Sequence, residues 1–201
     1  MLPIYLVSQK TLELWDYDTP FSTGIGGSET AHIECAIRLA KRGHNVISHC
    51  PLPEYKVGRI HEGVKWLDSE KELFPTEPAI IINYRCPKYF DRKKPKGQSW
   101  WFVAQDVDYE NQWTEQAIEN TDRFLALCKT HVDFTHDKYP GFRGKVYMSS
   151  NGIRTDYIEK LPPQERKPHR LFWASSPDRG LGLLLENWFR IRERFPNAEL
   201  H

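Results

Sequence analysis

The chain contains no long apolar run and no excess of charge of either sign. No hydrophobic stretch approaches the ~20 residues that a membrane-spanning helix needs. The N-terminus, MLPIYLVSQK, has no basic segment before its short apolar stretch, so it predicts a first strand and not a signal peptide. The 28 basic and 27 acidic side chains leave a net charge of +1. This balance excludes the strongly positive surface typical of a general nucleic-acid-binding protein.

Cysteines are also few, and none of them form a CxxC motif. Four cysteines in 201 residues do not make a disulfide scaffold. Because no export signal is seen, we expect Cys35, Cys50, Cys86 and Cys128 to be reduced, small buried side chains of a cytoplasmic protein. The mean hydropathy is low, at −0.64, but an aromatic content of 13% argues against disorder.

Short apolar strands alternate with amphipathic helices along the chain. This alternation predicts an α/β fold with a Rossmann-like parallel sheet. One helix follows Glu29, with Ile33, Ala36, Ile37 and Ala40 on one face and Gly43 at its C-terminal cap. The other expected helices are residues 114–120 and 130–138, and the expected strands are residues 3–8, 45–49, 79–84, 99–104, 123–128 and 145–149.

The composition changes after residue 158. The stretch EKLPPQERKPHR, residues 159–170, is rich in proline and charge, which is typical of a linker. A strand at 171–174 and a helix with a leucine stripe, ended by Pro196, follow it. We therefore expect one whole domain at residues 1–157, a linker at 158–170 and the beginning of a second, incomplete α/β domain at 171–201.

The motif GIGGSE, residues 24–29, lies between a strand and a helix. Glycine lets the backbone approach a ligand, and the helix that follows offers free N–H groups to an anion. The motif therefore predicts a loop that binds an anion or a sugar phosphate, with Gly26, Gly27, Ser28 and Glu29 as its ligand residues. It lacks the last glycine of GxGxxG, so it only weakly indicates a nicotinamide site. A plain turn in which Ser28 caps the helix is the alternative.

Polar residues follow the predicted strand at 99–104. Gln105, Asp106, Asp108 and Glu110 stand where ligands bind in open α/β sheets, outside the carboxyl ends of the strands. Carboxylates there can hold sugar hydroxyls or transfer protons. A solvated loop is the alternative.

Two further motifs stand at predicted turns. Asn151 and Gly152 form a turn signal, and Arg179 lies at the start of the leucine-striped helix, where a guanidinium can hold a diphosphate. For Arg179, an exposed helix cap is the alternative. The histidine spacing predicts no metal site. Trp100 and Trp101 are expected in the core, whereas Trp15 is the better candidate for stacking on a sugar.

Together these motifs resemble one family. GIGGSETAHIECAIRLAKRGHNV is similar to the N-terminal loop and first helix of the retaining, GT-B-fold glycosyltransferases of family 4. TDRFLALCKTHVDFTHDKYPGFRGKVYMSSNGIRTDYI resembles their passage from the acceptor domain into the hinge, and LFWASSPDRGLGLLLENWFRIRERFPNAELH resembles the first strand and helix of their donor domain.

The resemblance implies sugar transfer from a nucleotide-diphosphate sugar to a carbohydrate or lipid-linked acceptor, without a metal or cofactor. Gln105 and Asp106 match the family's catalytic His-Asp position, with Gln in place of His. Gly26, Gly27, Ser28, Glu29 and Asn151 match its substrate-binding loops, and Arg179 matches its diphosphate cation. The family's paired acidic residues lie beyond residue 201, so we expect this chain to be the acceptor-side half and inactive alone. Peripheral contact with a membrane is compatible with a lipid-linked acceptor.

Two other classes of function stay open. A non-catalytic module that binds carbohydrate or phosphate needs only the loops described above. A nicotinamide-dependent oxidoreductase or epimerase needs a Tyr-x-x-x-Lys pair, and Tyr84 and Lys88 have that spacing. Pro87 between them disfavours the helix that such a pair requires.

Overall fold

The computed structural model describes residues 1–8, 13–71, 74–163 and 165–201. It consists of two compact units, Met1–Gly152 and Ile153–His201. In these ranges, every helix is too short or too polar to span a lipid bilayer.

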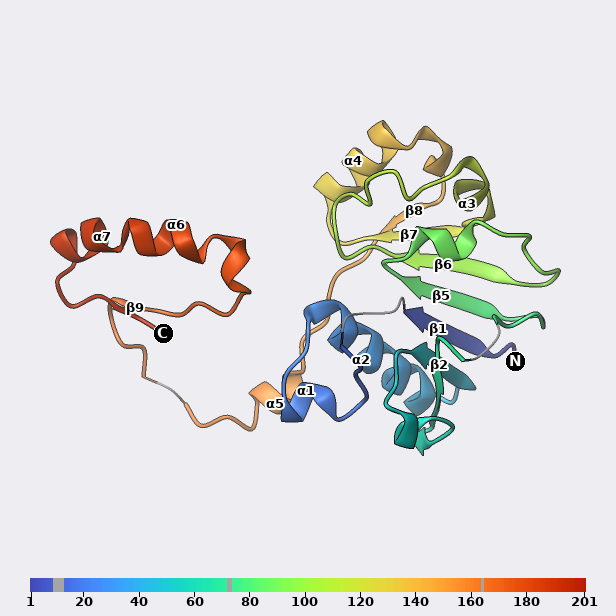
Figure 1. Cartoon of the computed structure of the whole chain (residues 1–201), viewed down its shortest axis with the longest axis horizontal. Coiled ribbons are helices and arrows are strands. Elements are labelled where there is room, and N and C mark those ends of the chain that lie inside the picture. The colour runs from blue at the N-terminus through green and yellow to red at the C-terminus, as the bar shows by residue number, and fades with distance from the viewer. Residues whose placement is uncertain (9–12, 72–73, 164) are drawn as a thin grey trace. The chain divides into compact units, whose positions relative to one another are not determined.

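An eight-stranded sheet forms the centre of the first unit (Figure 1). The strands run in the order β3-β4-β2-β1-β5-β6-β7-β8, and all neighbours pair in parallel except β3 with β4. Their bounds are Ile4–Ser8 (β1), Val46–Cys50 (β2), Ile60–His61 (β3), Val64–Asp68 (β4), Ile80–Tyr84 (β5), Ser99–Val103 (β6), Arg123–Ala126 (β7) and Val146–Met148 (β8). The α/β class and the parallel sheet are thus confirmed.

Helices pack on the sheet. Helix α2 contacts β1 and β2, and α4 contacts β7 and β8, as Figure 1 shows. Leu6 of β1 packs in one core cluster and Val7 in the other, so successive residues of a central strand are buried on opposite faces. The bounds are Thr19–Ser22 (α1), Gly27–Lys41 (α2), Glu115–Asn120 (α3) and Lys129–Lys138 (α4), with 3-10 turns at Glu54–Lys56, Pro87–Phe90 and Pro140–Phe142.

Helix α2 ends as the sequence predicts. Gly43 has a φ of +86° and its N–H donates to the Ala40 carbonyl, while the His44 N–H donates to the Leu39 carbonyl. This pair of bonds is a Schellman motif, which requires a left-handed residue after the helix. After this motif the chain enters β2, which pairs with β1.

Three features of the first unit differ from the sequence-based expectations. Strands β3 and β4 were not expected, because in β4 the buried Val64 and Trp66 alternate with the exposed Lys65 in a short, charged stretch. Trp15 is 1% exposed and packs in the core, so it is not an exposed stacking platform. All four cysteines are free, but only Cys50 and Cys86 are buried, whereas Cys35 is half-buried and Cys128 is exposed at the start of α4.

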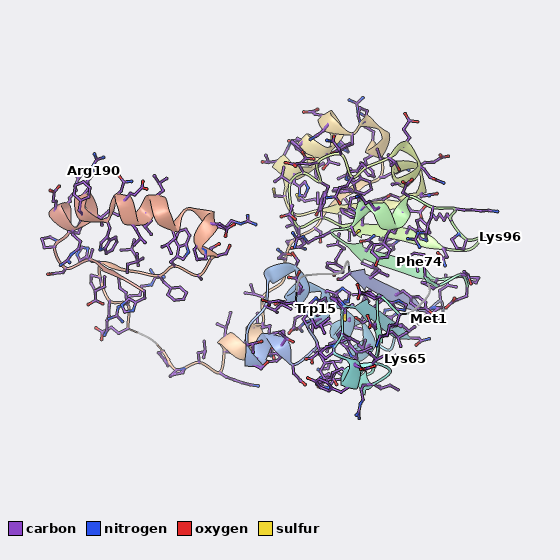
Figure 2. All side chains as sticks on the ribbon, in the orientation of Figure 1. Met1, Trp15, Lys65, Phe74, Lys96 and Arg190 are labelled. Carbon is purple, nitrogen blue, oxygen red and sulfur yellow. The ribbon has the colours of Figure 1, made fainter. Side chains whose placement is uncertain are left out.

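The second unit is a small strand–helix–strand arrangement. Strands β9 (Arg170–Leu171) and β10 (Glu199–Leu200) pair in parallel. Between them lie a 3-10 turn at Pro177–Arg179 and the helices α6 (Leu181–Glu186) and α7 (Trp188–Arg194), and α5 (Thr155–Ile158) precedes them. Figure 2 shows Arg190 on the side of α7 that faces away from β9.

The expected single helix is broken at Asn187, whose side-chain amide donates to the Leu183 carbonyl. An asparagine side chain that bonds to the backbone competes with the helical hydrogen bonds.

Candidate functional site

A cavity of about 640 Å³ opens at the carboxyl ends of the central strands of the first unit. Ser8 ends β1, Tyr84 ends β5, and the two are paired in the sheet register. The chain leaves β1 toward β2 on one side and returns to β5 on the other, so the cavity lies at the switch point of the sheet, where α/β folds bind ligands. It is lined by Ser8, Glu13, Leu14, Trp15, Thr19, Thr23, Gly24, Ile25, Gly26, Ser28, Glu29, Tyr84, Arg85, Asp106, Asp108, Tyr109 and Gln112.

An arginine side chain in the cavity lining lies between two carboxylates. Arg85 Nε donates to Asp106 Oδ2 at 2.9 Å, and its Nη1 lies 3.8 Å from Glu29 Oε1. Arg85 follows β5, Asp106 follows β6 and Glu29 stands in the first turn of α2. The Arg85 backbone has a φ of +63°, a left-handed conformation that is costly for a residue with a side chain.

The glycine loop faces the same space. Gly26 is the N-cap of α2, and a Cβ there would stand 2.5 Å from Glu29 Oε2, so the loop leaves room for this carboxylate. Gly27 begins α2 and has open space around it. Ser28 is the second residue of the helix and Gly26 holds the cap position, so Ser28 does not cap the helix.

A tyrosine positions the loop that holds Asp106. The Tyr109 hydroxyl accepts hydrogen bonds from the backbone N–H groups of Gln105, at 2.8 Å, and Asp106, at 3.2 Å. Burial raises the pKa of Tyr109, so its hydroxyl stays protonated at neutral pH. The buried ring thereby fixes the backbone beside the Asp106 carboxylate.

Asp108 lies at the edge of the same wall. It forms an ion pair with Lys138 and accepts a hydrogen bond from the Tyr139 hydroxyl at 2.8 Å. The Lys138 ammonium holds the pKa of Asp108 below its usual range, with the Tyr139 bond as a smaller cause. Asp108 is therefore a charged group that anchors α4 to this loop.

Behind the cavity, a row of polar side chains joins α2 to the sheet. His32 Nδ1 lies 2.7 Å from Ser8 Oγ and His32 Nε2 lies 2.7 Å from Ser48 Oγ. The imidazole is fully buried between the rings of Trp15 and Tyr84. Burial, with the nearby His49 as a smaller cause, lowers the pKa of His32 to about 3, so the ring is neutral. Figure 2 shows Trp15 beside α2.

Six of the residues that the sequence analysis singles out line one cavity: Trp15, Gly26, Ser28, Glu29, Asp106 and Asp108. Gln105 and Asn151 pair with each other outside the lining, where Gln105 Nε2 donates to Asn151 Oδ1 at 3.3 Å. Gly27 also lies outside the lining.

Arg179 belongs to the second unit, where it is exposed at the end of the 3-10 turn. Its role toward a diphosphate stays a prediction, as do the roles of the other predicted site residues.

Sequence reasoning missed Ser8, Tyr84 and Arg85. All three stand at the carboxyl ends of strands that the sequence does predict. Gln105 and Asp106 are selected because they follow β6. The same rule, applied to β1 and β5, also selects these three residues.

Tyr84 and Lys88 do not share a helix. Tyr84 ends a strand and Lys88 lies in a 3-10 turn that begins at Pro87, so their four-residue spacing does not form the helical pair of an oxidoreductase. Within the described part of the chain, no three His, Cys, Asp or Glu side chains come together as metal ligands.

Comparison with solved structures gives a match over the whole chain. The catalytic domain of starch synthase IV from Arabidopsis thaliana, solved with ADP and acarbose, matches with a TM-score of 0.56 and 11% sequence identity. The match covers 99% of this chain and 67% of that one. The chain has a GT-B-type fold. At this identity the likeness shows the fold alone. No protein-family model and no curated protein matches the chain.

Proposed function

We propose that the first unit binds the carbohydrate acceptor of a glycosyl-transfer reaction, and that the donor is a nucleotide-diphosphate sugar. One observation carries the proposal: Arg85, Asp106 and Glu29 converge in a cavity of ligand size at the switch point of the sheet. The GT-B-type fold supports the same reaction class. The neighbour bound to ADP and acarbose supports a nucleotide and a sugar as ligand classes.

The lining suits a neutral sugar better than a phosphate. Carboxylates such as Asp106 accept hydrogen bonds from hydroxyl groups, and the rings of Tyr84 and Tyr109 offer apolar contact beside them. The N-terminus of α2 already faces the carboxylate of Glu29, which would repel a second anion. We therefore assign the acceptor, and not the donor phosphate, to this loop.

In the proposed reaction, an acceptor hydroxyl attacks the anomeric carbon of the donor. The new C–O bond forms as the bond to the diphosphate breaks, and the hydroxyl proton passes to the departing diphosphate oxygen. Asp106 is the group that we propose to orient this hydroxyl, with Gln105 and Asn151 beside it. Arg179 is the proposed contact for the departing diphosphate. As in family 4, the expected outcome is retention at the anomeric carbon.

Titration calorimetry tests the binding step. We expect maltotriose and acarbose to bind the chain, and Asp106→Asn to weaken both by at least about tenfold, because a charged hydrogen bond contributes roughly 1.5–3 kcal/mol. Asp137→Asn, an exposed carboxylate on α4, is the matched control and should bind as the wild type does. Absence of any sugar binding would contradict the proposal.

Incubation of the chain, or of a longer one, with an acceptor sugar and with uridine, guanosine or adenosine diphosphate sugars tests the proposed glycosyl transfer. Transfer with retained anomeric configuration, followed by NMR, supports a retaining glycosyltransferase. Sugar binding without transfer from any donor, in this chain or in a longer one, supports the non-catalytic carbohydrate-binding module instead.

A further inference from the structure

The row of polar side chains behind the cavity can run in two directions, which differ in the tautomer of His32. Ser48 Oγ lies 3.8 Å from Cys50 Sγ, within reach of a weak hydrogen bond that Ser48 donates. In the direction that uses this bond, Ser48 Oγ is an acceptor toward His32, which places a proton on His32 Nε2. A neutral imidazole carries one proton, so Nδ1 has a free lone pair and takes the proton of Ser8 Oγ.

In this direction, Ser8 Oγ can only accept a hydrogen bond from a ligand in the cavity, because its proton is donated to His32. Its hydroxyl proton then points at His32, and Ser8 is one of the residues that line the cavity. A ligand atom that meets Ser8 Oγ is therefore favoured when it donates a hydrogen bond and disfavoured when it can only accept one.

Stability alone does not call for such a row. Ser8, His32 and Ser48 are all buried, at 7%, 0% and 0% exposure. Apolar side chains of similar shape in place of buried, hydrogen-bonded pairs are often neutral or stabilising. The core around this row consists of apolar side chains such as Leu6 and Ile33. Because the polar row begins at the cavity wall, we connect it with ligand binding and not with stability.

We propose that Ser8 determines acceptor specificity by accepting a hydrogen bond from one hydroxyl of the bound carbohydrate, and that His32 is the positioning residue that fixes this polarity. The inference rests on the proposed function, because it takes the ligand of the cavity to be a sugar. The inference also names the group of the sugar that Ser8 recognises. This group is a hydroxyl that donates a hydrogen bond, and not an ether oxygen, a carbonyl oxygen or a deoxy position.

The tautomer of His32 tests the polarity without any ligand. Long-range ¹H–¹⁵N correlation NMR on the full chain should show a neutral ring with its proton on Nε2 across neutral and mildly acidic pH, with His32→Gln used to assign the signal. A proton on Nδ1 would overturn the inference and leave the proposed function untouched.

A sugar panel tests the specificity. Methyl α-glucoside and its monodeoxy analogues, titrated by NMR, should reveal one deoxy analogue that binds the wild type about tenfold more weakly than the parent. In Ser8→Ala this difference should disappear, since the hydroxyl has lost its partner, and in His32→Gln it should shrink. Ser99→Ala is the control, since Ser99 accepts a bond from Trp101 Nε1 and does not line the cavity.

The outcomes separate the two proposals. If the wild type and Ser8→Ala bind the panel with the same preferences, the specificity role is wrong although carbohydrate binding stands. An equal loss of affinity for every sugar in Ser8→Ala indicates a merely structural serine and also overturns the inference. If the wild type binds no member of the panel, the specificity role falls together with the assignment of a glucose-type acceptor, and maltotriose and acarbose binding then decides the proposed function.

Discussion

At the scale of single residues, the two glycines at the start of α2 are not equivalent. A Cβ on Gly26 would meet the Glu29 carboxylate, whereas a Cβ on Gly27 would meet open space. The sequence assigns both glycines to the ligand, but only Gly26 lines the cavity.

We expect Gly26→Ala to displace Glu29 from Arg85 and to weaken sugar binding by about tenfold, which corresponds to roughly 1.4 kcal/mol. Gly27→Ala should bind normally and gain about 0.5–1 kcal/mol of stability, because alanine is favoured over glycine in a helix. Calorimetry and urea unfolding measure both effects. An equal loss of affinity in the two variants would support the original assignment of both glycines to the ligand.

Arg85 combines a functional side chain with a strained backbone. Glycine adopts a φ of +63° readily, so Arg85→Gly should be about 1 kcal/mol more stable than Arg85→Ala. Both variants remove the guanidinium that holds Asp106, and both should bind sugar more weakly than the wild type.

Urea unfolding compares the stabilities of the two Arg85 variants, and sugar titration compares their affinities with that of the wild type. Equal stability would show that the left-handed conformation at this position carries no strain, and wild-type affinity in both would remove Arg85 from the site.

At the scale of elements, α2 is attached to the sheet through a histidine that does not take up a proton. The pKa of His32 is about 3 in the fold and near 6.5 in an unfolded chain. Below about pH 6.5 the unfolded state therefore binds a proton that the folded state does not bind. The stability contribution of His32 is complete above that pH and declines as the pH falls toward 3.

We expect the wild type to lose up to about 1.4 kcal/mol of unfolding free energy per pH unit between pH 6 and pH 4 through this group. His32→Gln should lack this part of the acid sensitivity. Urea unfolding at several pH values gives the two slopes, and parallel slopes would show that His32 is protonated in the fold.

The elements also show how far the sequence predicts this fold. Strands such as Ile80–Tyr84 are short, apolar runs next to turn signals, and these are recognisable without any tertiary information. Val64–Asp68 is not, because its exposed Lys65 and acidic surroundings hide a pattern that only pairing with β2 stabilises. The break at Asn187 depends on one side-chain hydrogen bond, which no helical periodicity reveals.

The candidate site is predictable only in part, for a similar reason. Asp106 and the glycine loop have local signals, a carboxylate after a strand and a run of glycines. Ser8 and Arg85 have only their place at the end of a predicted strand, and they become parts of one site when β1 and β5 lie side by side. The partner of His32 on β2, Ser48, likewise depends on how α2 packs.

At the scale of the whole molecule, the chain divides into two units of different character. The first encloses two apolar clusters, whereas large apolar side chains of the second, such as Leu183 and Phe189, are more than half exposed. Residues 159–163 and 165–169, which lead from α5 to β9, are exposed and have no helix or strand.

We expect limited trypsin digestion to cut first at Lys160 or Arg166, because proteases act on exposed, irregular backbone. Mass spectrometry should identify a resistant fragment that contains residues 1–152, and this fragment should still bind the sugars that the full chain binds. A first cut within β1 to β8 would show that the first unit is not the more stable one.

Trp15 gives the cavity a built-in optical reporter. Of the seven tryptophans, it alone belongs to the cavity lining as the structure describes it, and its ring contacts the His32 imidazole. A ligand that enters the cavity therefore changes the surroundings of one indole while the other six keep theirs. Intrinsic fluorescence should follow occupancy directly, and Trp15→Phe should abolish the signal while calorimetry still detects binding. A signal that survives in Trp15→Phe would place the bound ligand beside another tryptophan, outside this cavity.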